Sequence, residues 1–232
     1  MYDPEGNIPQ PVAPQAWYQL GVLVIDGSGS MTLPYAGDEE VGLEGGAVRS
    51  KAEATGDALG GFVTRMKQSV NASNFGLSFV FFNDAVTHDR KPTLVPDLDP
   101  NASYDPTAYG IGGTAIHSGL DAAASMVETF MREGAALEVP LSAVVVLMSD
   151  GEERDDPVKT AAAANRIKGL PKTRLTSCLF ATQGQPAVGE ALLQEVASAP
   201  QFYQRAYSTE QLRSFFEDSL TTVGRELTGP LE

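Results

Sequence analysis

The sequence predicts an α/β fold with a doubly wound, mainly parallel central sheet flanked by helices. Short apolar runs of strand length alternate along the chain with longer segments whose apolar residues recur at helical spacing. Two of the apolar runs lead into an aspartate followed by glycine. Such alternation is typical of parallel sheets joined by crossover helices, which bind ligands at the carboxyl ends of their strands.

The apolar runs identify the strands. Residues 20–25, LGVLVI, and 142–148, SAVVVLM, are continuously apolar or small, as in central strands buried on both faces. The segment 86–94 contains Pro92, which cannot donate to a strand ladder, so we expect it at an edge of the sheet. Further strands are expected at 75–82, 174–181 and 202–207.

Helical spacing of apolar residues places helices between these strands. The helices are expected over 50–70, 115–132, 157–168, 187–198 and from 208 onward. Ser208, with Gln211 three residues later, predicts a capping box at the start of the last helix. Residues 96–107 are rich in Pro, Asp and Asn, which favours a long surface loop.

A chain of 232 residues is long enough for one domain with a substantial apolar core. We expect this domain to cover residues 17–223. Residues 1–16 form a Pro-rich lead-in, and residues 224–232 form a tail.

Composition excludes several classes of partner and site. The formal net charge of −14 disfavours nucleic acid, because a surface this acidic repels phosphate. Cys178 is the only cysteine, so an internal disulfide and a cysteine-based zinc site are both excluded. The first residues lack a signal-peptide pattern, and the longest apolar run, 141–148, is too short to span a bilayer. We therefore expect a cytoplasmic bacterial protein with neither a nucleic-acid nor a membrane partner.

Three separate segments carry oxygen-bearing side chains to one edge of the predicted sheet. Asp26, Ser28 and Ser30 follow the first strand in the sequence DGSGS, and Asp150 follows the strand 142–148. Thr114 ends the glycine-rich sequence GIGGT, directly before a helix. Because the carboxyl ends of parallel strands meet at one edge, we expect these five side chains to converge.

A set made only of oxygen donors suits a hard divalent cation. We expect Mg²⁺ or Mn²⁺, with Ca²⁺ as an alternative, whereas zinc would favour His or Cys ligands. Neutral hydroxyls leave the ion electrophilic, so an open coordination position would capture an anionic oxygen. A carboxylate from another protein is the most natural source of that oxygen.

These residues resemble the metal-ion-dependent adhesion site (MIDAS) of von Willebrand factor A (vWA) domains, written DxSxS, then T, then D. Every position of that motif is filled here. The resemblance implies that Ser28, Ser30 and Thr114 touch the ion, with Asp26 and Asp150 often acting through water. It also implies a non-catalytic protein-binding module whose partner supplies an acidic side chain. Several intracellular relatives are adaptors in systems with ATPases, kinases or phosphatases.

One segment departs from that family's pattern. The insertion 32–48 separates the DGSGS motif from the first helix, where many relatives begin the helix almost at once. We expect it to overhang the metal edge. Its acidic residues are candidates for a second cation site or a lid: Asp38, Glu39, Glu40 and Glu44.

Two alternatives to an interaction module stay open. A phosphohydrolase of the haloacid-dehalogenase type also ends its first strand in an aspartate and uses Mg²⁺. That enzyme needs a second aspartate two residues later as general acid, and Ser28 stands at this position. We therefore expect no enzymatic activity. In the second alternative, the cation only holds the loops together and has no part in binding.

Overall fold

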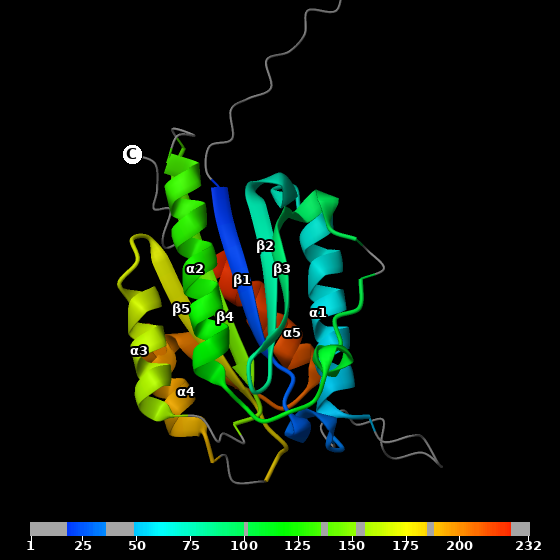
Figure 1. Ribbon diagram of the computed structural model, residues 1–232. Coiled ribbons are helices and arrows are strands. Elements are labelled where there is room, and N and C mark those ends of the chain that lie inside the picture. Colours follow the sequence, from blue (N-terminus) through cyan, green and yellow to red (C-terminus); the bar gives the residue numbers. More distant parts are fainter. Residues whose placement is uncertain are drawn as a thin grey trace, which may run out of the picture.

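The computed structural model describes residues 18–35, 49–99, 102–135, 139–151, 156–184 and 188–223. These residues form three layers, with a sheet between two groups of helices (Figure 1). The predicted fold class is confirmed.

The sheet has six strands in the order β3-β2-β1-β4-β5-β6. Every neighbouring pair is parallel except β2 and β3, which are antiparallel. The segment with Pro92 thus forms the predicted edge strand. The strands are β1 Tyr18–Asp26, β2 Phe75–Phe82, β3 Val86–Leu94, β4 Leu141–Ser149, β5 Thr173–Phe180 and β6 Tyr203–Ala206.

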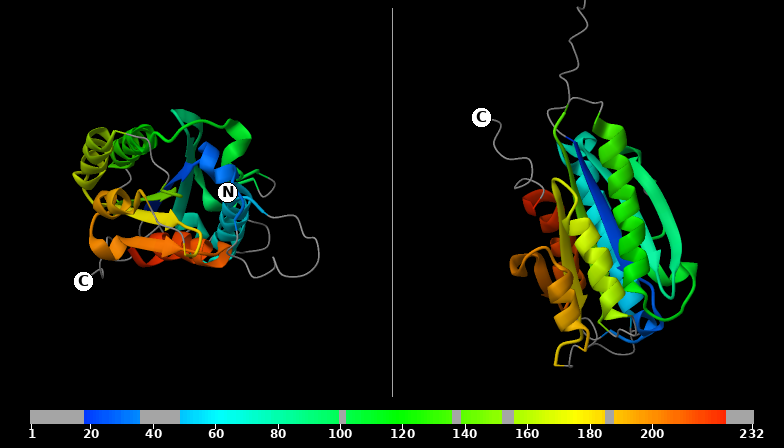
Figure 2. Two further views of the ribbon diagram at one scale, coloured as in Figure 1. Left: turned by 90° about the horizontal axis from the view of Figure 1, so that it is seen from below. Right: turned by 60° about the vertical axis from the view of Figure 1, so that its left-hand side comes forward.

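Helices cover both faces of the sheet, as the turned view in Figure 2 shows. Helices α1 and α5 pack with one buried apolar cluster, and α2, α3 and α4 with the other. Their bounds are α1 Lys51–Gln68, α2 Ile116–Gly134, α3 Pro157–Lys168, α4 Glu190–Val196 and α5 Thr209–Asp218. Short 3₁₀ turns lie at Gly29–Thr32, Ala72–Asn74, Val95–Asp97, Pro106–Tyr109 and Pro200–Phe202, and a π turn lies at Ser219–Val223.

The predicted capping box at Ser208 is wrong in one of its two bonds. The Ser208 hydroxyl accepts the Gln211 N–H at 3.1 Å, but the Gln211 side chain accepts from Tyr207 at 2.7 Å. The backbone at Ser208 is more extended (φ −149°) than the backbone at Ser50 (φ −80°), which starts a complete capping box. The Gln211 side chain therefore meets the N–H of Tyr207 instead of the N–H of Ser208. A complete capping box starts α1, where Ser50 (φ −80°) and Glu53 bond reciprocally.

Smaller differences concern the lengths of elements. The described part of α4 begins at Glu190, after a turn, and is shorter than the predicted 187–198. The predicted loop at 96–107 includes the start of the Pro106–Tyr109 turn, where the Asp105 carboxylate accepts the N–H of Thr107. That turn is important for the site, because it packs beside the end of β1.

Strand β1 lies between β2 and β4. The connection through α1 leads from β1 to β2 on one side of it, and the connection through α2 leads from β3 to β4 on its other side. Such a switch in direction opens a crevice at the carboxyl ends of the two central strands. Residues that follow β1 and β4 therefore lie together at the carboxyl edge of the sheet, which is the lower end of the sheet in Figure 1.

Substitution of Gly27 tests how closely the end of β1 packs against the Pro106–Tyr109 turn. A Cβ on Gly27 would lie 2.5 Å from the backbone oxygen of Pro106, so Gly27→Ala should lower the free energy of unfolding by roughly 1–3 kcal/mol. The control is Gly60→Ala on α1, where the nearest atom is 4.0 Å away and helix propensity should add up to about 1 kcal/mol. Urea unfolding of both variants measures the difference. Equal effects would contradict the close approach at Gly27.

Candidate metal centre

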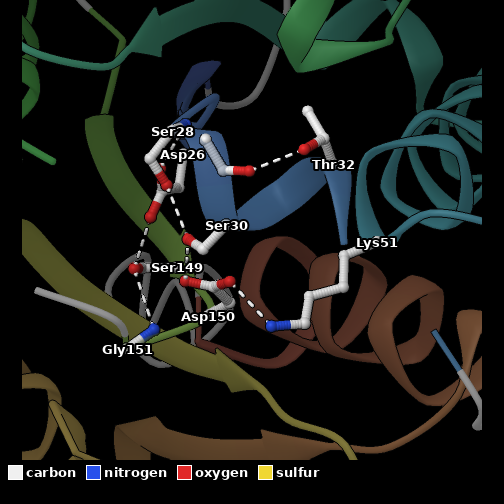
Figure 3. A network of polar contacts seen from close by, with 9 residues as sticks. Asp26, Ser28, Ser30, Thr32, Lys51, Ser149, Asp150 and Gly151 are labelled. Carbon is white, nitrogen blue, oxygen red and sulfur yellow. Dashed lines mark hydrogen bonds and ion pairs between the residues drawn. The ribbon is translucent and has the colours of Figure 1, made fainter. Parts of the chain in front are cut away.

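The pairing of β1 with β4 brings the two predicted carboxylates together. Ile25 pairs with Met148, so strands β1 and β4 end at about the same level of the sheet. Asp26 ends β1, and Asp150 follows the last residue of β4. Figure 3 shows both carboxylates among the hydroxyls of the following turn.

Asp26 is completely buried and held on both carboxylate oxygens. Its Oδ1 accepts the N–H of Ser28 at 2.8 Å. Its Oδ2 accepts the hydroxyl of Ser149 at 2.6 Å, and that hydroxyl accepts the N–H of Gly151 at 3.2 Å. These bonds fix the orientation of the carboxylate at the base of the crevice.

The two serines of the DGSGS sequence join Asp26 to Asp150. Ser28 Oγ and Ser30 Oγ lie 3.0 Å apart, and Ser30 Oγ donates to Asp150 Oδ1 at 3.0 Å (Figure 3). Four of the five predicted site residues therefore form one connected network: Asp26, Ser28, Ser30 and Asp150.

The fifth residue, Thr114, is on a loop fastened to the same turn. Gly29 N–H donates to the carbonyl of Gly112 at 2.8 Å, and Gly113 N–H donates to Asp84 Oδ1 at 2.9 Å. A Cβ on Gly112 or Gly113 would lie 2.3 or 2.4 Å from the Asp84 carboxylate, so a side chain at either position would force that carboxylate to move. Thr114 follows directly and is buried.

Sequence reasoning missed Lys51, the first residue of α1. Lys51 Nζ donates to Asp150 Oδ2 at 2.7 Å, and the Lys51 and Asp150 side chains are 9% and 0% exposed. The insertion separates Lys51 from the DGSGS sequence, so its spacing from the motif carries no signal. Ser149 and Asp84 were also missed, although Ser149 immediately precedes a predicted ligand.

The pKa of the Asp26 carboxyl is raised from 3.8 to about 6. Burial is the main cause, because it disfavours the charged form, and the negative charge of Asp150 acts in the same direction. Hydrogen bonds from Ser149 and Ser28 oppose both effects. A positive charge close to Asp26 and Asp150 would therefore stabilise the ionised site.

The chemistry of these donors fits a hard divalent cation. Two carboxylates and the serine and threonine hydroxyls offer only oxygen, which Mg²⁺, Mn²⁺ and Ca²⁺ prefer. In the part of the chain that the structure describes, no three His, Cys, Asp or Glu side chains gather as a metal site, so the hydroxyls would be needed as ligands.

The predicted acidic residues of the insertion, Asp38, Glu39, Glu40 and Glu44, lie outside the described residues. The start of the insertion is described. Thr32 donates its hydroxyl to the carbonyl of Gly29 at 2.7 Å. Tyr35 is buried, packs on Phe180 with ring centroids 4.7 Å apart, and donates its hydroxyl to the carbonyl of Tyr207.

Comparison with known proteins identifies the fold family. The sequence profile of the von Willebrand factor type A domain matches residues 22–218. The chain belongs to the von Willebrand factor type A domain family. All five motif residues of this vWA domain lie within the matched range.

Solved structures share the vWA fold at low sequence identity. SpaC, a pilus adhesin of Lactobacillus rhamnosus GG, matches with TM-score 0.60 and 14% identity over 96% of this chain and 31% of SpaC. PilB, a minor pilin of Streptococcus sanguinis, matches with TM-score 0.65 and 13% identity over 95% of this chain and 65% of PilB. This chain therefore spans only about a third of SpaC.

A third structure contains a metal. Proximal thread matrix protein 1 of the mussel byssus, with a zinc-occupied MIDAS motif, matches with TM-score 0.51 and 17% identity over 90% of this chain and 46% of that protein. No curated protein sequence matches the chain. Among the described residues, no helix has both the length and the apolar character needed to cross a bilayer.

The raised pKa predicts a pH dependence for the metal-free domain. Because the folded-state pKa of Asp26 exceeds its unfolded value, the folded form holds the proton more tightly. This stabilisation is complete below pH 3.8 and is lost as the pH rises through about 6. Between about pH 7 and pH 5 the gain should be about 1 kcal/mol.

Chemical unfolding of the wild type and Asp26→Asn in chelator measures this effect. The asparagine has no such proton, so the stability difference between the two proteins should change over this pH range. A difference that stays constant would contradict the assignment to Asp26.

Proposed function

We propose that this vWA domain is a protein-recognition module that binds a carboxylate of its partner through a divalent cation. The cation would be held by Asp26, Ser28, Ser30, Thr114 and Asp150. The observation that carries the proposal is the hydrogen-bonded network at the ends of β1 and β4, which already gathers four of these residues.

The donor set explains why such a site would recognise an acid. The hydroxyls of Ser28, Ser30 and Thr114 carry no charge, so they do not quench the charge of the cation. A bound divalent ion would therefore supply an electrophilic centre for an anionic oxygen. Mg²⁺ is the proposed ion, with Mn²⁺ or Ca²⁺ as alternatives; the zinc in the byssus protein supports a metal at this motif without fixing its identity.

The proposed role is that of an adaptor without catalysis of its own. Asp26 is poorly placed as a nucleophile, because it is fully buried and both of its oxygens accept hydrogen bonds. The general acid of a haloacid-dehalogenase-type enzyme is replaced by Ser28. Partners in an ATPase, kinase or phosphatase system of a bacterial cytoplasm are the proposed setting.

The location is a separate part of the proposal. Two of the similar structures are a pilus adhesin and a minor pilin, which would favour a surface role if the likeness extended to function. The lone cysteine, Cys178, is buried in β5 and favours neither setting. Cell fractionation in the native host distinguishes them: recovery with the cytoplasm supports the adaptor, and recovery with the cell surface overturns that setting.

Metal binding should depend on the Thr114 hydroxyl. Thr114→Val keeps the side-chain shape and removes one oxygen, so the Mg²⁺ affinity should fall at least about tenfold, and Asp26→Ala should abolish binding. Thr64→Val, on the exposed surface of α1, is the matched control and should bind as the wild type does. Isothermal titration with MgCl₂ measures all four proteins. If Thr114→Val binds Mg²⁺ with wild-type affinity, Thr114 is not a ligand of the ion.

Association should require both the metal and the site. We expect a partner recovered from the native host in Mg²⁺ to be lost with EDTA and with Asp26→Ala, but retained with Thr64→Val. Replacing the partner's acidic residues by amides should then locate the carboxylate. If chelation lowers the melting temperature and leaves association intact, the cation is purely structural and the proposal is wrong.

The absence of catalysis is tested with a panel of phosphomonoesters in Mg²⁺. We expect no turnover above that of Asp26→Ala. Turnover that needs both Mg²⁺ and Asp26 would instead support the phosphohydrolase.

A further inference from the structure

The Lys51–Asp150 pair is unusual in its burial. One carboxylate oxygen of Asp150 accepts a hydrogen bond from Ser30, and the other accepts from Lys51. The side chains of Lys51 and Asp150 are both at most 9% exposed. The pair Arg166–Glu128, by contrast, joins side chains that are 39% and 38% exposed. Removing an ammonium from water is costly, so a buried lysine needs a strong local source of negative charge. Figure 3 shows Lys51 reaching into the site from the start of α1.

The helix gains nothing from a cation at this position. Lys51 is the first residue of α1, where the helix dipole presents its positive end and disfavours a lysine. The capping box of Ser50 and Glu53 satisfies the N–H groups of these two residues, and a lysine ammonium, which only donates, could satisfy no N–H group. The position of Lys51 is therefore explained by the crevice and not by the helix.

We propose that Lys51 fixes the net charge of the metal site and thereby selects an anionic partner group. This inference rests on the proposed function and deepens it. With both aspartates ionised, Asp26 and Asp150 contribute two negative charges and Lys51 one positive charge. The site alone then carries one negative charge, and with a divalent cation it carries one positive charge.

A net positive charge distinguishes between possible ligands of the ion. A single carboxylate neutralises the loaded site, whereas an amide or a water leaves it charged among buried side chains. Without Lys51 the loaded site would already be neutral, and a carboxylate would have no such advantage. Lys51 also repels the cation, so it weakens metal binding while it strengthens capture of the partner.

Lys51→Gln tests the charge, because glutamine keeps an N–H donor for Asp150 and removes the positive charge. Isothermal titration should show Mg²⁺ binding at least about tenfold tighter than in the wild type. Lys51→Arg, which keeps the charge, should bind Mg²⁺ with an affinity much closer to that of the wild type than Lys51→Gln does. Equal affinities in Lys51→Gln and the wild type would overturn the inference.

The second readout compares acetate with acetamide as probes of the Mg²⁺-loaded domain, followed by NMR titration. The wild type and Lys51→Arg should bind acetate in preference to acetamide, and Lys51→Gln should lose most of this preference. An unchanged preference would overturn the role in ligand selection even if the metal affinity rises.

A charge-rescue pair covers the case in which Lys51→Gln does not fold. Asp150→Asn alone leaves Lys51 without its carboxylate and should bind Mg²⁺ very weakly. The double variant Lys51→Gln, Asp150→Asn regains the net charge of the wild-type site, so it should bind at least about tenfold tighter than Asp150→Asn. Equal binding by these two variants would contradict the inference. A wild type that binds no Mg²⁺ would instead defeat the proposed function itself.

Discussion

Asp26 and Asp150 follow the paired ends of neighbouring strands, so two buried carboxylates lie at one edge of the sheet. Burial, together with the smaller effect of the Asp150 charge, raises the pKa of Asp26 to about 6. The rest of the crevice compensates for this negative charge with the Ser149 hydroxyl, the Ser28 N–H and the Lys51 ammonium. A divalent cation would complete the compensation, which is why the edge suits metal-dependent recognition.

The scaffold holds this arrangement by close backbone approach. Gly27 passes beside the Pro106–Tyr109 turn, and Gly112 and Gly113 pass beside the Asp84 carboxylate, so segments distant in sequence meet around the end of β1. The six-stranded sheet and its two apolar clusters give these loops a rigid base. A site of small polar side chains can then be placed accurately without a bound ligand.

Much of this structure could be predicted from sequence, because buried strands are continuous apolar runs. The prediction for β2 and α3 agrees with the structure at both ends, and Pro92 correctly indicated the edge strand. The candidate site followed because Asp26 and Asp150 each come at the end of such a run. Lys51 could not be found this way, since its contact depends on where α1 begins in space relative to Asp150 and not on local pattern. The capping box predicted for α5 was wrong in one bond for a similar reason, because that bond depends on the backbone angle at Ser208.

The most direct test of the central claim is a crystal structure of the domain grown with Mn²⁺, in which anomalous scattering locates the ion. The account predicts an anomalous peak bounded by the hydroxyls of Ser28, Ser30 and Thr114 and by the Asp26 and Asp150 carboxylates, with the Ser30–Asp150 hydrogen bond rearranged around it. A crevice without a peak at saturating Mn²⁺, with Ser30 still donating to Asp150, would contradict the account.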